Sequence, residues 1–176
     1  MKFQRLSVAM IATAAGLSAS AGANAAVDIF LQIDGIQGES ADAKFKGASE
    51  VLAWSWVEVS TANGKKGCIE DMHITKFVDK ASPALITNAS TGALASKAVL
   101  SVRKAGEGPV TFLIITMNGV RVSSYQVAGS SGAGTVAENL ALSFETMSGE
   151  YRAQKPDGSL DAGIPWNIGP NGAKCQ

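Results

Sequence analysis

The chain has 176 residues, with 15 Lys plus Arg against 15 Asp plus Glu and a formal net charge of zero. A balanced chain without a basic cluster argues against nucleic acid as a principal partner. No segment reaches the uninterrupted apolar length of about 20 residues that a transmembrane helix requires, so the sequence predicts no membrane span.

The first 25 residues have the features of a secretory signal peptide. Lys2 and Arg5 form a short basic start, an apolar run follows over residues 6–17, and a small-x-small triplet ends at Ala25. A retained N-terminal anchor is the alternative, although the run is too short to cross a bilayer. We expect cleavage between Ala25 and Ala26, export by the general secretory route, and a periplasmic or secreted mature protein.

Two cysteines remain in the mature chain, which is about the size of one domain. An oxidising compartment permits a disulfide between Cys68 and Cys175. Closing a loop of about 100 residues would stabilise the fold by roughly 4–5 kcal/mol in the chain-entropy model. Two free thiols are the alternative.

Alternating apolar and polar residues predict strands through the first part of the mature chain. The first strand covers residues 27–33, and a polar, glycine-containing loop follows over 34–47. A second strand at 51–60 and a third at 68–78 flank a turn at 61–67 that contains Asn-Gly.

The faces of these strands carry the first candidate residues. Trp54 and Trp56 share one face of the second strand, where they could stack on sugars. Packing in the core and at an interface is the more ordinary role for such a pair. In the third strand, Met72, Ile74 and Lys76 share one side.

One short helix of about eight residues is predicted after the third strand. Ser82 is a good N-cap, Pro83 suits the first helical position, and Gly92 can end the helix. A helix of this length is marginal alone and must dock on an apolar surface.

Further strands are predicted at 97–103, 109–118, 121–127 and 138–146, with a Gly/Ser loop at 128–135. The segment 109–118 is almost entirely apolar, which suggests burial on both faces. In 138–146, the even-numbered residues 140, 142 and 144 place Leu, Leu and Phe on one face.

These elements define the domain organisation and the fold class. Residues 1–25 are the signal peptide, 26–151 the folded domain, and 152–176 an irregular, Gly- and Pro-rich tail packed on that domain. Seven or eight short strands, one helix and no βαβ alternation predict a mainly β protein, an antiparallel barrel or sandwich.

No residue pattern points to catalysis. His73 is the single histidine and lies mid-strand, and Asp71 falls on the same strand face, but a lone strand histidine is usually structural. The glycine-rich loop at 129–134 lacks the strand-to-helix context of a phosphate cradle. Because metal-binding and nucleophile motifs are also missing, we expect no enzyme activity, no cofactor and no metal.

Several segments in order resemble the haemolysin-coregulated protein (Hcp) family, the tube subunits of bacterial type VI secretion. The similar segments cover nearly the whole mature chain: 26–40, 51–56, 74–85, 97–106, 138–144 and 163–168. Within them, the family-motif residues are Trp54, Trp56, Lys76, Asp79, Ser82 and Pro83.

The resemblance implies a compact antiparallel β-barrel of two sheets with one short flanking α-helix. It also implies a non-enzymatic subunit of homohexameric rings that stack into a propelled tube and shelter cargo in the lumen. Familiar members start near the equivalent of Ala26, without a signal peptide, and have a longer connection than 61–67. These two departures are the reason for an alternative, an exported monomeric binding module for an effector or an envelope protein.

Overall fold

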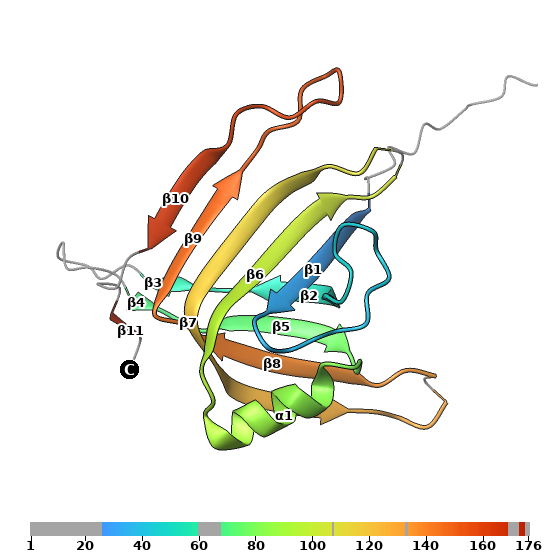
Figure 1. Ribbon diagram of the computed structural model, residues 1–176, viewed down its shortest axis with the longest axis vertical. Coiled ribbons are helices and arrows are strands. Elements are labelled where there is room, and N and C mark those ends of the chain that lie inside the picture. The colour runs from blue at the N-terminus through green and yellow to red at the C-terminus, as the bar shows by residue number, and fades with distance from the viewer. Residues whose placement is uncertain (1–25, 60–67, 107, 133, 169–172, 175–176) are drawn as a thin grey trace, which may run out of the picture.

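The computed structural model describes residues 26–59, 68–106, 108–132, 134–168 and 173–174 (Figure 1). Its elements are β1 (Val27–Ile33), β2 (Ser49–Ser55), β3 (Glu58–Val59), β4 (Cys68–Ile69), β5 (Met72–Phe77), α1 (Ser82–Thr91), β6 (Ala95–Lys104), β7 (Thr111–Ala128), β8 (Ala137–Ser143), β9 (Thr146–Tyr151), β10 (Ile164–Ile168) and β11 (Ala173–Lys174). The predicted turn at 61–67 lies outside the described residues.

The strands form a closed barrel with a two-stranded extension. The main sheet has the order β10-β9-β7-β6-β1-β2-β5-β8, and an additional β7–β8 pairing closes the six strands from β7 to β8. β9 and β10 continue the sheet beyond β7, and a small sheet of β11, β4 and β3 lies at one end (Figure 1). The predicted mainly β, antiparallel barrel with one short helix is therefore confirmed.

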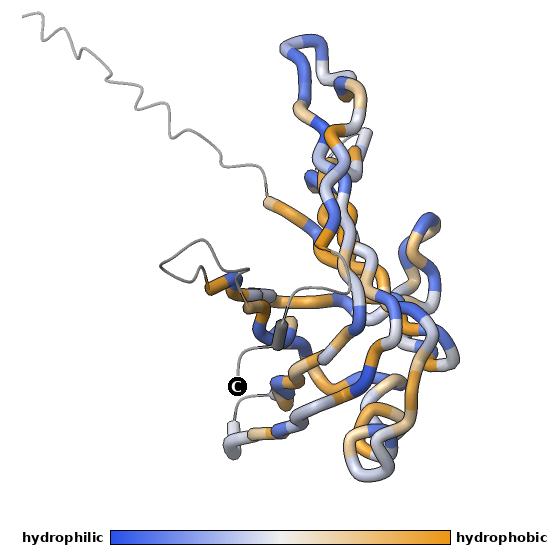
Figure 2. The backbone as a smooth tube through the Cα atoms, turned by 90° about the vertical axis from the view of Figure 1, so that its left-hand side faces the viewer, coloured by the Kyte–Doolittle hydropathy of each residue, from blue (hydrophilic) through white to orange (hydrophobic). Residues whose placement is uncertain are grey.

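The core lies inside the barrel, on the predicted strand faces. Hydrophobic and hydrophilic residues alternate along the strands (Figure 2). The inward residues are almost completely buried: Met72, Ile74, Leu100, Ile115, Met117, Leu140 and Leu142. The prediction for 109–118 was wrong in one respect, because the opposite face of that segment is only half buried at Phe112, Ile114 and Thr116.

β7 is one strand of 18 residues where the sequence predicted two. Its first part pairs with β6 and β9, and its second part pairs with β8, so it belongs to both halves of the barrel. Gly119 marks the change with a left-handed φ of 62°, and the Glu145 side chain occupies the place where a β-carbon would lie. The glycine therefore allows the strand to bend at the point where the sequence predicted that one strand ends and the next begins.

The helix begins one residue earlier than predicted. Ala81, not Ser82, is the N-cap, and Ser82 is the first residue of the helix. Asp79 replaces the expected cap, because its Oδ1 accepts from the Ala81 amide at 2.9 Å while its own amide donates to Ser82 Oγ at 2.9 Å. Gly92 ends the helix with φ 67°, as predicted.

The second and third predicted strands are each interrupted. A bulge between Val51 and Ala53 changes the register of β2 against β5, and the strand ends at Ser55 before β3 begins. The predicted third strand is divided into β4 and β5. Met72, Ile74 and Lys76 share one side as predicted, and the structure places that side in the core, with Lys76 fully buried.

The tail is more regular than expected. β9 was not predicted, and β10 lies inside the segment expected to be irregular, paired with β9 from Ile164↔Tyr151 to Ile168↔Met147. Pro165 is tolerated because β10 is the edge strand of the sheet. Gly149 makes the pairing possible, since a β-carbon there would lie 2.3 Å from the Trp166 ring.

Candidate assembly surface and ion clusters

A dry ion cluster lies where the helix meets the barrel. Lys76 Nζ is 2.6 Å from Asp79 Oδ1 and 2.8 Å from Glu138 Oε1, and the three side chains are 0%, 8% and 0% exposed. Lys76 Nζ also donates to the Phe77 carbonyl at 2.9 Å. Glu138 Oε1 has no well-aligned hydrogen bond within the described residues, so the ion pair alone compensates its burial.

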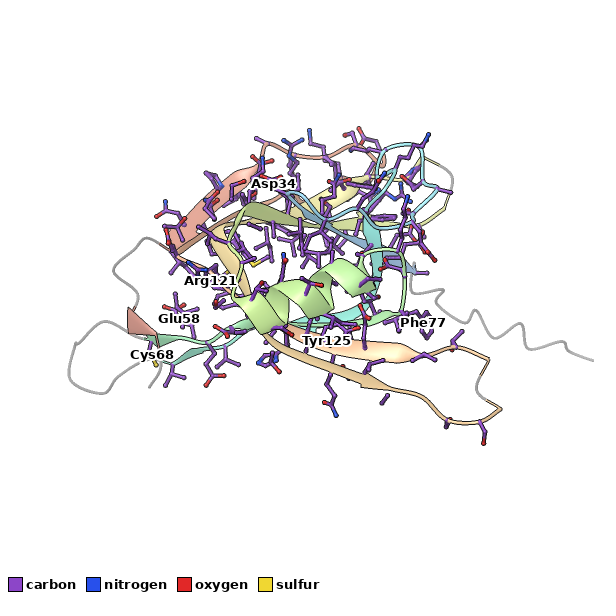
Figure 3. All side chains as sticks on the ribbon, turned by 60° about the horizontal axis from the view of Figure 1, so that its bottom comes forward. Asp34, Glu58, Cys68, Phe77, Arg121 and Tyr125 are labelled. Carbon is purple, nitrogen blue, oxygen red and sulfur yellow. The ribbon has the colours of Figure 1, made fainter. Side chains whose placement is uncertain are left out.

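Tyr125 completes this cluster from β7, beside helix α1 (Figure 3). Its hydroxyl donates to Glu138 Oε2. Burial, and then the hydrogen bond to Glu138, raise the pKa of Tyr125 to about 12. The cluster thus joins β5, β7, β8 and the start of α1 at the seam that closes the barrel. Of the family-motif residues, Lys76, Asp79 and Ser82 meet here, and Pro83 is exposed in the first turn of the helix.

A second, wetter ion cluster holds the 34–48 loop against β1 and β6. One terminal nitrogen of Arg103 lies 2.8 Å from both Asp28 and Asp42. The guanidinium stacks over the Phe30 and Phe45 rings, at 4.9 Å and 5.6 Å from their centroids. The hydrogen bond from Arg103 holds the pKa of Asp42 below its usual value.

The outer face of the β2-β5-β8-β7 sheet carries no Asp, Glu, Lys or Arg over three rows of paired residues. These rows, called here the uncharged face, are Ser55-His73-Ala141-Ser124, Ala53-Thr75-Asn139-Gln126 and Phe77-Ala137-Ala128. Most of these side chains are exposed, since their neighbours along each strand point into the core. Charged residues flank the face at one end, with Asp71 and Arg121.

His73 and the glycine loop have places that fit structural roles. His73 is exposed in the first row of the uncharged face, and the Asp71 carboxylate accepts from Ser123 Oγ. The glycine-rich segment at 129–134 connects β7 to β8, which agrees with the predicted hairpin connection. Within the ranges that the structure describes, no group of three or more His, Cys, Asp and Glu could hold a metal ion.

The paired tryptophans are packing residues. Both Trp54 and Trp56 are half buried against the main core. Trp56 also stacks on Trp166 of β10, with centroids 6.0 Å apart and an interplanar angle of 16°. The stack fastens the β9–β10 extension to the barrel. Nothing in the sequence indicated this contact between Trp56 and Trp166.

Cys68 lies on β4, where the C-terminal strand returns (Figure 3). β11 pairs with β4 in parallel, with Ala173 opposite Cys68. The described part of the chain contains no free cysteine. Cys175 and the signal residues up to Ala25 lie outside the described residues. No described helix has the length and hydropathy to cross a membrane.

A family model described as type VI secretion system effector, Hcp, matches residues 30–151. The chain belongs to the Hcp family. The protein hcp1 of Pseudomonas aeruginosa is 37% identical over 158 residues, which covers 83% of this chain and 98% of that protein. The family assignment made from the sequence is therefore confirmed.

Solved structures agree with the Hcp assignment. Hcp1 from Salmonella typhimurium has a TM-score of 0.70 at 32% identity, covering 85% of this chain and 98% of that one. A type VI secretion system effector from Yersinia pestis has a TM-score of 0.68 at 30% identity, covering 81% and 99%. Hcp proteins are structural, non-enzymatic components of type VI secretion, which agrees with the prediction that this chain is not an enzyme.

Proposed function

We propose that this protein is an exported Hcp-like subunit that forms hexameric rings related to the type VI secretion tube and shelters small cargo in the ring lumen. The family match over residues 30–151 carries the proposal. A closed ring needs two different, complementary surfaces on each subunit. The barrel with its β9–β10 extension presents sheet faces of different composition on different sides, which suits such heterologous contacts.

The uncharged face is our candidate for the wall of the lumen. A lumen that accepts cargo of either charge is served by a wall without fixed charge, because a charged wall would retain one sign and repel the other. Small side chains such as Ala53, Ser55 and Ala128 leave the centre of the ring open. Lys76 and Glu138, the charged residues of β5 and β8, point inward and neutralise each other.

Ring formation is tested by size-exclusion chromatography with light scattering at tens of micromolar. We expect a mass six times that of the protomer, and a strict monomer would reject the ring. The Gln126→Lys variant tests the lumen assignment. An unchanged ring mass is expected if the uncharged face lines the lumen, whereas a loss of the ring would show that this face is a subunit contact.

Export and the disulfide form the second part of the proposal. The family match begins at residue 30, so the signal-like residues 1–25 lie before it. The pairing of Ala173 with Cys68 brings the chain near Cys175 toward β4, which supports a Cys68–Cys175 bond. The mass of protein recovered from the cell envelope should correspond to a start at Ala26 with two fewer hydrogens, and two reactive thiols in that protein would exclude the bond.

The monomeric binding module stays the alternative function. A monomer that starts at Ala26 and captures a specific effector or envelope protein would favour it over the ring.

A further inference from the structure

The barrel is open along part of one seam, between β1 and β2. β1 pairs with β6 along its whole length, from Val27↔Lys104 to Ile33↔Ala98. With β2 it shares only two residue pairs, Phe30↔Glu50 and Leu31↔Ser49. Toward Val27 the two strands therefore separate, and Figure 1 shows β2 turning away from β1.

The backbone of β1 faces this gap with groups that no described strand pairs. The Asp34 amide donates to the Lys97 carbonyl, and the Ala105 amide donates to the Ala26 carbonyl, so the even-numbered residues of β1 direct their amides and carbonyls toward β6. Alternate residues of a strand direct these groups to opposite sides. Val27 and the Ile29 amide consequently face the gap, whereas Leu31 and the Ile29 carbonyl face the two residue pairs that β1 shares with β2.

A cavity of about 380 Å³ occupies the gap. This volume falls within the range of about 300–1,000 Å³ that is usual for ligand sites. Its apolar lining includes Val27 and Leu52, residues that are 48% and 50% exposed. An unpaired strand edge beside exposed apolar side chains is the arrangement that binds extended peptides by strand addition.

The charge around the cavity selects the peptide. The carboxylates of Asp28, Asp42 and Glu50 line it against a single cation, Arg103. Arg103 is already engaged by Asp28 and Asp42, so the lining is acidic overall. The nearby lysines do not line the cavity; Lys44, for example, donates to Thr111 Oγ1 on β7.

We propose that the gap between β1 and β2 binds an extended segment of another protein, in which apolar residues surround a lysine or arginine. The segment pairs with Val27 and Ile29 as an added strand and places its cation among the carboxylates. A second copy of this chain is a poorer occupant, because its described edge strands do not offer a lysine or arginine within a longer apolar strand. β10 is uncharged, β3 carries Glu58, and β11, which carries Lys174, has only two residues.

Binding of short peptides to the purified protein tests the proposal. The probes are a labelled peptide of alternating valine and threonine with one central lysine, and a matched peptide with glutamate in that place. Fluorescence anisotropy should show saturable binding of the lysine peptide and at least about tenfold weaker binding of the glutamate peptide. Equal binding of both peptides, or no saturation by the lysine peptide, would overturn the proposal.

Val27→Pro removes the amide that faces the gap, at a strand-end position where proline is tolerated. We expect it to weaken lysine-peptide binding by about tenfold, whereas Val27→Ala, which keeps the amide, stays within roughly threefold. Glu50→Gln should weaken binding by roughly two- to fivefold. Wild-type affinity of Val27→Pro would contradict strand addition.

Two more measurements distinguish strand addition from a disturbed fold and from self-association. Methylation of alternate amides in the lysine peptide alters only the probe and leaves the protein intact. It should abolish binding to the wild-type protein, and this result does not depend on whether Val27→Pro disturbs the fold. Sedimentation velocity without peptide reports self-association. If Val27→Pro converts a wild-type oligomer into monomers, a second copy fills the gap and the proposal is wrong. The peptide result does not depend on ring formation, so either hypothesis can fail without the other.

Discussion

The two ion clusters have the same composition and different surroundings. Each holds one cation between two carboxylates, Lys76 with Asp79 and Glu138, and Arg103 with Asp28 and Asp42. The Lys76 cluster is almost dry, whereas the side chains of Asp28 and Asp42 are 38% and 20% exposed. Because water can replace a lost partner only in the Arg103 cluster, the same deletion should have different costs in the two places.

The clusters also connect different parts of the molecule. The Lys76 cluster joins the seam of β5, β8 and β7 to the helix, so its loss should affect global unfolding. The Arg103 cluster fixes a loop to the outside of β1 and β6, with Phe30 and Phe45 stacked at 4.4 Å beneath it. Its loss should chiefly release the loop.

The largest effect is expected for Lys76→Met, which leaves the buried Glu138 carboxylate without its cation and with only the Tyr125 hydrogen bond. We expect the free energy of unfolding to fall by about 3–5 kcal/mol in urea titrations. The double variant Lys76→Met/Glu138→Leu is the matched control, because it removes both charges of the buried pair. It should recover the part of the loss that comes from Glu138, while the part that comes from Asp79, which also pairs with Lys76, remains. A single variant within 1 kcal/mol of the wild type, on the order of a surface substitution, would contradict the dry-cluster description.

Tyr125→Phe should cost about 1 kcal/mol, since it removes one hydrogen bond to Glu138. The pKa of Tyr125 is raised from its ordinary value of 10.0 to about 12, so its contribution is complete below pH 10. That contribution is lost as the pH rises from 10 through 12. Urea titrations between these values should show wild type and variant converging, and a constant difference would argue against the assigned pKa.

Arg103→Gln should lower stability by about 1–2 kcal/mol at low salt, through lost ion pairs and ring contacts. The loss should shrink in concentrated salt because the carboxylates are partly exposed, whereas the effect of Lys76→Met should not change. Lys155→Gln is the control, since its pair with Asp161 is about half exposed at 3.3 Å and should contribute nothing measurable. A salt-independent loss for Arg103→Gln would remove the distinction between the clusters.

The smallest effect is expected for Asp42→Asn. The pKa of Asp42 is lowered from 3.8 by the Arg103 hydrogen bond, so its carboxylate stabilises the fold above pH 4 or so, and this is lost as the pH falls through the lowered pKa. Thermal unfolding should therefore separate wild type and variant at neutral pH and bring them together in acid. A difference that grows in acid would have the wrong sign.

Where residues alternate, the sequence was sufficient to predict the fold. The spacing of Met72, Ile74 and Lys76 predicted that they share one side of β5, and the structure shows that this side, with its lysine, is buried. Glu138 has the same parity as Leu140 and Leu142, so the opposite charge was visible too. The ion pair between Lys76 and Glu138 could not be predicted, because it depends on β5 lying beside β8, a contact between distant parts of the chain.

The extension was missed for reasons of composition. β9 contains Ser148 and Gly149, and β10 contains Pro165, residues that local patterns assign to turns. They form strands because β7 is long enough to offer an edge and Trp166 packs over Gly149. The β1–β2 gap had no local signal either, since it results from where two strands part.

The continuity of β7 has a mechanical consequence. One backbone without a break runs from the β9 side, through the bend at Gly119, to the hairpin beyond the helix. A force applied along the strand at the hairpin is carried by covalent bonds to the opposite end of the subunit, and the flanking β6, β8 and β9 ladders resist it in shear. A subunit pulled along β7 would therefore resist extension through its backbone and these three ladders together.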